Sequence, residues 1–386
     1  MLRTLKSGFS MRVRSYKEGD EKKLVSLFDL CFSKRGLSPK RTVRDWIWHF
    51  KQYPMFSPRT VLIAERDDEI IGSIIVTLHD FQVRDRTFKV GILEDAMTHP
   101  KFAGRGICSD LTSLAIDVAK SLKIDFIEAF PQYHNSTYRI FKYKHDFQEI
   151  AKINLLLKPL DYLKTAFLIP KLMTSQYLHG FFGLLTNPES LVQPTGLFSF
   201  FHKEHHTMNG SIYNYDEGDE SAIIEMMNQY NSSKAGYSGR TLEYWRWRYS
   251  LCPDFKRENI FLMKLENRIA GHIAVGFQDY VISQGGASAR VAFLYDLCSR
   301  NYQSNRKREI ESLLLACASS YAKSRDGLFA MTFTCANDIQ TVNLFKQVGF
   351  YVIGAFPALI KPVSKDFSID SLQFEQLYVP VESIIK

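Results

Sequence analysis

The feature that most constrains the fold of this chain is an internal repeat. The run "EGDE" occurs at residues 18–21 and again at 217–220, an offset of 199 residues. The same offset relates five further identities: Trp46 and Trp245, Trp48 and Trp247, Pro54 and Pro253, Gly72 and Gly271, and Asp80 and Asp279. A series of matches in one register indicates a duplicated domain. We therefore expect an N-terminal domain at 11–155, a helical connector at 156–209 and a C-terminal domain at 210–386.

Composition excludes several classes of protein. The chain has 386 residues, 45% of them hydrophobic and 23% charged, which fits a two-domain soluble protein. Its six cysteines include no closely spaced pair, so we expect no disulfide framework, no zinc site and a cytoplasmic location. We see no signal peptide and no apolar run of about 18 residues, and so expect no transmembrane segment. The net charge of +8 fits an anionic ligand, a membrane surface or nucleic acid, and does not choose among them.

Helices and strands alternate within the first copy. The pattern of apolar residues predicts helices at 20–32, from Ile107 onward and at 135–143. It predicts strands at 59–66, 70–79, 88–98, 124–130 and 147–157. This alternation indicates an α/β unit with a mixed sheet flanked by helices.

The stretch "HPKFAGRGICSDL" (99–111) joins a predicted strand to a predicted helix. The first N–H groups of a helix lack partners, and the helix dipole favours an anion there. Gly104 and Gly106 would let a phosphate approach the backbone, and Arg105 would add positive charge. The stretch therefore predicts a phosphate-binding turn, with an ordinary strand-to-helix turn as the alternative.

Two motifs together resemble those of the GCN5-related N-acetyltransferase (GNAT) superfamily. The acetyl-CoA loop of that family, V-x-P-x-x-(R/Q)-G-x-G-x-(G/A), is matched by Thr98, Pro100, Ala103, Gly104, Arg105, Gly106 and Cys108. The later family motif, an Asn followed by a Y-x-x-x-G-F-like segment, is matched by Asn135 and by Tyr138 to Tyr143. Ala103, Cys108 and Lys142 depart from the family pattern. The resemblance implies two tandem acyl-CoA N-acyltransferase (GNAT-like) domains, each a mixed sheet flanked by helices.

The resemblance also implies an acyl donor and a set of site residues. Acetyl-CoA would bind, with no metal, at ten residues: Ala96, Met97, Thr98, Ala103, Gly104, Arg105, Gly106, Ile107, Cys108 and Asn135. Tyr138 would protonate the leaving thiolate, unless it is a core aromatic residue. Glu94 or Asp95, which alternate to opposite faces of a strand, would act as the base, although a structural role fits either one.

The second copy lacks these signals. At an offset of 201 residues, Asn305 and Lys307 stand opposite Gly104 and Gly106. Phe345 stands where we align Tyr138. We therefore predict that the second copy is not catalytic and that its aromatic and basic run at 244–249 forms a wall of the acceptor cleft.

The function predicted from these observations is transfer of an acetyl or other acyl group from acetyl-CoA to a primary amine. The acceptor would be a small molecule or a peptide; we expect no nucleic acid, and an oligomer is compatible with the sequence. Two alternatives are a non-catalytic acyl-CoA-binding or scaffold protein and an aminoacyl transferase of the tandem type. The run "HKEHH" (202–206) is interpreted as a polar linker rather than a metal site.

Overall fold

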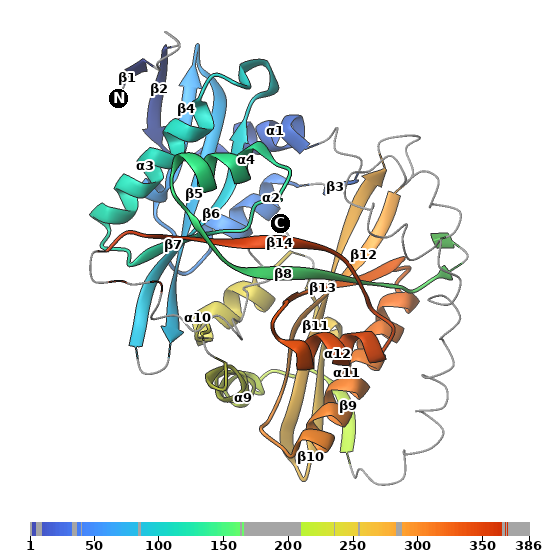
Figure 1. Cartoon of the computed structure of the whole chain (residues 1–386). Helices are drawn as coiled ribbons and strands as arrows, with labels where there is room; N and C mark the ends of the chain where they lie inside the picture. Colours follow the sequence, from blue (N-terminus) through green and yellow to red (C-terminus); the bar gives the residue numbers. More distant parts are fainter. Residues whose placement is uncertain are drawn as a thin grey trace.

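The helices and strands of the two copies follow the same order (Figure 1), apart from two short strands of the first copy, at residues 2–4 and 37–39, that have no counterpart among the described residues of the second. The first copy contains β1 (Leu2–Thr4), β2 (Ser10–Ser15), α1 (Glu21–Phe32), β3 (Leu37–Pro39), α2 (Val43–Trp46), β4 (Val61–Arg66), β5 (Glu69–Val83), β6 (Arg86–Thr98), α3 (Ile107–Ser121), β7 (Phe126–Ala129), α4 (Ser136–Arg139) and β8 (Gln148–Pro159). The second contains β9 (Gly210–Asn214), α9 (Glu220–Ser232), α10 (Leu242–Trp245), β10 (Ile260–Leu265), β11 (Arg268–Ile282), β12 (Ser288–Ser299), α11 (Ser304–Ser324), β13 (Phe329–Cys335), α12 (Ile339–Gln347) and β14 (Tyr351–Pro362). Helices α2, α4 and α10 each continue into a π-helical turn, at Ile47–Lys51, Ile140–Lys144 and Arg246–Ser250.

This computed structural model describes most of the chain. The described residues are 2–4, 10–32, 37–39, 41–83, 86–162, 164–165, 210–234, 236–253, 255–282, 288–364, 367 and 369. Residues 166–209 of the predicted connector, which include the "HKEHH" run, lie outside the described residues. Within it, no helix is long and apolar enough to cross a membrane.

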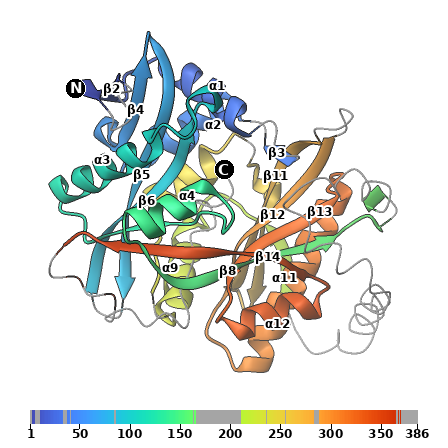
Figure 2. The same ribbon diagram turned by 45° about the horizontal axis from the view of Figure 1, so that its top comes forward.

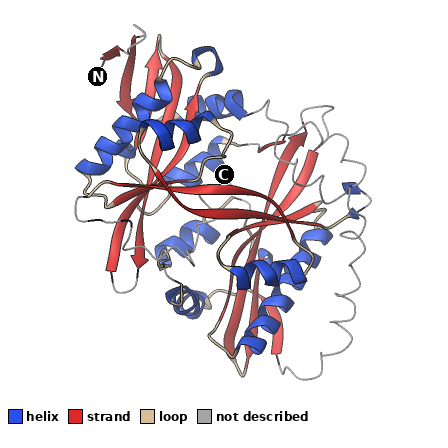
Figure 3. Ribbon diagram, in the orientation of Figure 1, coloured by secondary structure: helices blue, strands red, loops and turns tan. Residues whose placement is uncertain are grey.

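The strands form one continuous sheet that passes through both copies. Its order is β1-β2-β4-β5-β6-β7-β14-β8-β13-β12-β11-β10-β9, with β3 paired to β11. Among the described strands, only the ladders β6–β7 and β12–β13 are parallel. Figures 2 and 3 show the long strands β8 and β14 crossing between the two halves of the sheet. The predicted mixed sheet flanked by helices is confirmed.

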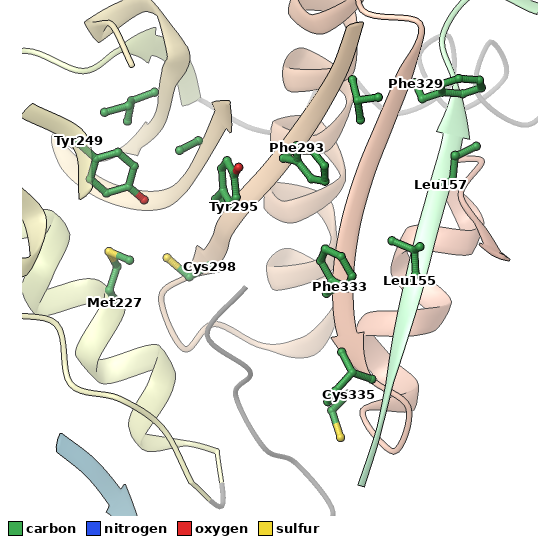
Figure 4. Close-up of a cluster of buried hydrophobic side chains, with 14 of the residues drawn as sticks. Leu155, Leu157, Met227, Tyr249, Phe293, Tyr295, Cys298, Phe329, Phe333 and Cys335 are labelled. Carbon is green, nitrogen blue, oxygen red and sulfur yellow. The ribbon is translucent and has the colours of Figure 1, made fainter. Parts of the chain in front are cut away.

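The last strand of each copy is exchanged into the sheet of the other. β14 pairs with β7 of the first copy, and β8 pairs with β13 of the second. Figure 4 shows Leu155 and Leu157 of β8 among the buried side chains of the second copy, which include Phe329 and Phe333. Strand β8 runs to Pro159, beyond the boundary that we predicted at residue 155. Neither copy therefore has a complete sheet of its own.

Two helical layers cover the sheet of the first copy. Ile107 and Leu111 of α3 pack with Ile74 of β5 on one face, which we call the α3 face. Leu24 of α1 packs with Ile75 of β5 on the opposite face, the α1 face. The strands place successive side chains on these two faces in turn.

The elements predicted from the apolar pattern are confirmed, and the repeat identities have structural causes. Gly19 and Gly218 of the two "EGDE" runs have φ of 95° and 106°, which favours glycine just before a helix. A β-carbon at Gly72 would lie 2.7 Å from Ile107, and one at Gly271 would lie 2.7 Å from Ile310. Glycine at both positions lets a helix pack closely on the strand.

The tryptophans of the repeat join the two copies. The indole N–H of Trp48 donates to the carbonyl of Trp247, and that of Trp247 donates to the carbonyl of Trp48, each at 2.7 Å. The two rings are stacked with centroids 5.4 Å apart. Trp247 is 2% exposed, and its neighbours Trp245, Arg248 and Tyr249 are also buried. The prediction that the run at 244–249 forms an acceptor wall is therefore wrong for these residues, which pack in the core and at the junction between the copies.

Candidate active site

The glycine loop has the geometry of an open anion-binding turn. Gly104 and Gly106 have φ of 77° and 90°, in the left-handed region where glycine is favoured. A β-carbon at Gly104 would meet no heavy atom within 4 Å. Gly106 is the N-cap of α3 and supplies no side-chain cap. The N–H groups of the first turn therefore face an exposed loop, and this arrangement fits the pyrophosphate of acetyl-CoA.

The strand before this loop separates from its neighbour. The ladder between β6 and β7 has three residue pairs, of which the last is Ile92 with Glu128. Beyond Ile92, β6 remains paired only to β5 among the described residues. A bulge at Asp95, which has φ of 44°, accompanies the divergence. The resulting splay leaves one edge of residues 93–98 without a partner strand among the described residues. An extended ligand could pair with this edge as an added strand would.

The second copy has a splay but no loop. The shared contacts with Gly72 and Gly271 place Ile310 opposite Ile107, an offset of 203 residues. At that offset Glu309 lies opposite Gly106, which corrects the offset of 201 that we used for this helix. Helix α11 already begins at Ser304, and the N–H of Lys307 donates to the carbonyl of Gln303 at 3.0 Å. A turn of helix thus stands where the first copy has its loop.

Buried polar contacts also line the corresponding part of the second copy. The Ser299 hydroxyl donates to Glu311 at 2.8 Å, and both residues are buried. Lys234 forms an ion pair with Asp338 at 2.6 Å. Because these side chains satisfy one another, they offer little to an incoming phosphate.

Tyr138 lies in a hydrogen-bonded cluster on the α3 face. Its hydroxyl accepts a hydrogen bond from Lys142 at 2.8 Å and donates one to Glu149 at 3.2 Å. Tyr133 donates to the other oxygen of Glu149 at 2.6 Å. The hydrogen bond to Tyr138 is the main cause that raises the pKa of Lys142 to about 12. The Tyr138 hydroxyl therefore lies between the ammonium of Lys142 and the carboxylate of Glu149.

The helix caps refine the alignment of the two copies. Asn135 caps α4 by accepting from the N–H of Thr137, and Asp338 caps α12 by accepting from that of Thr341. Counted from these caps, Thr341 rather than Phe345 lies opposite Tyr138. The second copy still has no phenol at this position. Asn135, a predicted cofactor residue, is engaged here as a helix cap.

The two predicted bases differ in their surroundings. Asp95 forms a buried ion pair with Arg41, and Asp296 forms the equivalent pair with Arg240 in the second copy. Because the pair recurs where the glycine loop is absent, it is explained by the architecture of the bulge. Burial is the largest influence on Asp95 and raises the pKa of its carboxyl.

Glu94 has contacts that the second copy does not reproduce. It is 7% exposed, its Oε1 lies 3.4 Å from Nε2 of His49, and its other oxygen accepts from the hydroxyl of Thr77. At the equivalent positions the second copy has Tyr295 and Arg248, whose guanidinium lies 4.1 Å from the ring of Tyr295. The sequence did not single out His49, which lies in a π-helical turn distant from both motifs.

The remaining predicted cofactor residues surround the splay. Ala96 packs on the α3 face, whereas Met97 is buried on the α1 face. The thiol of Cys31 donates to the carbonyl of Thr98 at 3.3 Å. Burial raises the pKa of the Cys108 thiol to about 11, so that side chain is a neutral thiol. Ala103 and Arg105 are exposed in the loop, and Ile107 is buried beneath it.

No group of three or more potential metal ligands gathers in the part of the chain that the structure describes.

Comparison with known proteins decides the class of this fold. Residues 12–145 match the family model of the acetyltransferase (GNAT) domain. The chain is a tandem GNAT-fold protein whose first copy is a GNAT domain. No curated protein matches it in sequence.

Solved structures resemble the tandem GNAT fold over most of its length. Saccharomyces cerevisiae N-myristoyltransferase with bound myristoyl-CoA has a TM-score of 0.67 at 12% identity, and the match covers 91% of this chain and 82% of that one. A GCN5-related N-acetyltransferase from Anabaena variabilis has a TM-score of 0.55 at 10% identity, covering 92% and 73%. At these identities the likeness concerns the fold.

Proposed function

We propose that this GNAT protein is an acyl-CoA-dependent N-acyltransferase that transfers an acetyl group from acetyl-CoA to a primary amine. The observation that carries the proposal is the co-occurrence, in one copy only, of the open glycine loop and the splayed strands. The second copy keeps the splay but replaces the loop with helix α11. Its role is structural, since it supplies β14 to the sheet of the first copy.

The loop and the splay would hold the donor in one orientation. Backbone N–H groups of residues 104–108 would bind the pyrophosphate, and the free edge of β6 at residues 96–98 would bind the pantetheine amides. When bound, acetyl-CoA supplies an acyl group activated as a thioester. A backbone N–H near Met97 would stabilise the negative charge that develops on the carbonyl oxygen.

Tyr138 is the proposed general acid. Its phenol would give its proton to the leaving thiolate, and Lys142 would stabilise the resulting phenolate. Glu94, held by Thr77 and His49, and Asp95, held by Arg41, are the bases proposed from sequence. Of these two, Glu94 fits better because its contacts are specific to the catalytic copy.

We also propose a class of acceptor, a reaction without a metal and a cellular location. The acceptor is a small-molecule or peptide amine, and the protein acts without a metal. None of the six cysteines forms a disulfide, which fits the reducing cytoplasm in which we place the protein. A non-catalytic acyl-CoA-binding protein is the alternative, and it would not need the contacts of Tyr138.

The test is to measure acetyl-CoA binding and thiol release together. Wild-type protein should gain thermal stability with acetyl-CoA and release coenzyme A thiol when amines are added. Gly106→Glu should lose both responses, because it adds a strained, negatively charged side chain where the pyrophosphate lies. Glu309→Gln, at the equivalent place in the second copy, is the matched control and should keep both. Binding without thiol release from any amine would favour the scaffold alternative.

A further inference from the structure

Glu128 lies at the point where β6 and β7 separate. It forms the last residue pair of their ladder, opposite Ile92, and is followed by Ala129, where β7 ends. Its side chain is 6% exposed, and Oε2 has no hydrogen-bond partner among the described residues. A buried carboxyl oxygen without a hydrogen-bond partner destabilises a fold. The fold alone therefore does not explain a glutamate at this position.

The side chain of Glu128 lies on the face opposite the acyl-CoA loop. Its neighbours Ile127 and Ala129 both pack against α3 and α4 on the α3 face. Alternation along the strand directs Glu128 to the α1 face. If acetyl-CoA enters the splay from the α3 face, an acceptor that attacks its thioester from the opposite side would approach along the α1 face.

The second copy supplies an internal control for this position. Its parallel ladder has the same three-pair form, and there Met331 stands opposite Phe293, as Glu128 stands opposite Ile92. An apolar side chain therefore satisfies the architecture at this place. The carboxyl occurs only in the copy that also has the glycine loop.

Other polar groups share the α1 face with Glu128. Glu94 lies on it because it pairs with Ile75, which packs against α1. His49 contacts Glu94 from the π-helical turn after α2. His79 of β5 is 7% exposed, and neither of its ring nitrogens has a hydrogen-bond partner among the described residues. Burial and the nearby Arg240 lower the pKa of His79 to about 3, so it is neutral.

Resting on the proposed N-acyltransferase function, we propose that Glu128, rather than Glu94 or Asp95, is the general base that takes the proton of the acceptor ammonium. The N–H bond breaks, the proton passes to the carboxylate, and the nitrogen lone pair attacks the carbonyl carbon of the thioester. The C–S bond then breaks, and the thiolate takes the proton of Tyr138. The acylated nitrogen gives up its second surplus proton, which restores the phenol of Tyr138. The flanking Ile92 is buried, so an acceptor whose nitrogen is carried on an apolar stem would suit this place.

The electrostatic environment of Glu128 suits this role. Burial raises the pKa of its carboxyl from 4.5 to about 8, close to the pH at which a base must exchange a proton. The raised pKa also predicts a pH dependence of stability. Between pH 4.5 and about 8 the folded protein holds a proton that the unfolded chain has lost, so stability falls as pH rises through that window.

The test compares wild type with Glu128→Gln and Glu128→Met, using n-butylamine as the acceptor probe. Both variants should keep the thermal shift with acetyl-CoA and melt no lower than wild type. Their melting temperatures should exceed that of wild type by a margin that grows from pH 4.5 to 8. Thiol release should fall by about a hundredfold or more and lose its rise with pH. Thiol release within twofold of wild type would overturn the proposal. So would a lower melting temperature in both variants, because it would show a structural role.

An infrared measurement keeps the test independent of turnover. Wild type at pH 7 should show the carbonyl band of a protonated carboxyl that is absent from Glu128→Gln, and n-butylammonium should abolish that band. A missing band, or one that the amine leaves unchanged, contradicts the assignment. Failure of the proposed function is distinct, since it would appear in wild-type protein, either as no thermal shift with acetyl-CoA or as binding without thiol release from any amine.

Discussion

Single residues fall into two groups, those that both copies share and those that only the first copy has. The buried pairs Arg41–Asp95 and Arg240–Asp296 belong to the shared group and hold the bulge of each copy. Glu94 and Glu128 belong to the second group, with Tyr295 and Met331 in their places. Residues that recur in both copies are therefore explained by the fold, and residues found only in the first copy are the candidates for a role in its site.

At the residue scale, the role of Tyr138 is open to a matched test. Tyr138→Phe should keep acetyl-CoA binding but lower turnover by about a hundredfold to ten-thousandfold, because only the proton-donating oxygen is removed. Tyr133→Phe is the control, since that tyrosine also donates to Glu149. Steady-state thiol release checks both. Equal losses in the two variants would assign the effect to Glu149, and no loss in Tyr138→Phe would make it a packing residue.

Sequence alone was informative about residues with a local signature. The turn at Gly104 and Gly106 was predictable because glycine is the residue that adopts a left-handed backbone most readily, and two glycines stand directly before an amphipathic helix. The roles of Glu128 and His49 were not predictable from the sequence. Each is one polar residue among apolar ones, and the residues that it contacts are distant in the sequence. Asn135 matched a family motif, yet in the fold it caps α4.

At the scale of elements, the helices and strands of each copy followed from apolar periodicity, but their pairing did not. The exchange of β8 and β14 leaves no trace in the sequence, since an exchanged strand has the same alternation as one that stays. The offset between copies also changes from 201 on the strand to 203 on the helix. The contacts of Gly72 and Gly271, the caps of α4 and α12 and the parallel ladders of the two copies make that change visible.

The close approach of α3 to the sheet gives the prediction at this scale. Gly72→Ala should destabilise the protein by roughly 1–3 kcal/mol, because the new methyl group overlaps Ile107 and the helix that carries the glycine loop must shift. Acetyl-CoA affinity should fall as well. Gly354→Ala is the control, since a β-carbon there meets nothing within 4 Å. Thermal melting with and without acetyl-CoA measures both effects, and equal stability in the two variants would contradict the packing argument.

At the scale of the whole molecule, the two copies share one sheet, and the glycine loop occurs in the first copy. The sheet is continuous, the reciprocal tryptophan hydrogen bonds join the halves, and each copy lacks a strand that the other provides. The second copy, which has helix α11 in place of the glycine loop, provides the strand β14 that pairs with β7 and extends the sheet of the first copy.

The central claim is that one copy binds the acyl donor and the other supports it. Calorimetric titration of the full chain with acetyl-CoA tests this claim most directly, because it counts sites. We predict one acetyl-CoA per chain, with binding abolished by Gly106→Glu and unchanged by Glu309→Gln. Two sites per chain, or binding that survives Gly106→Glu, would contradict it.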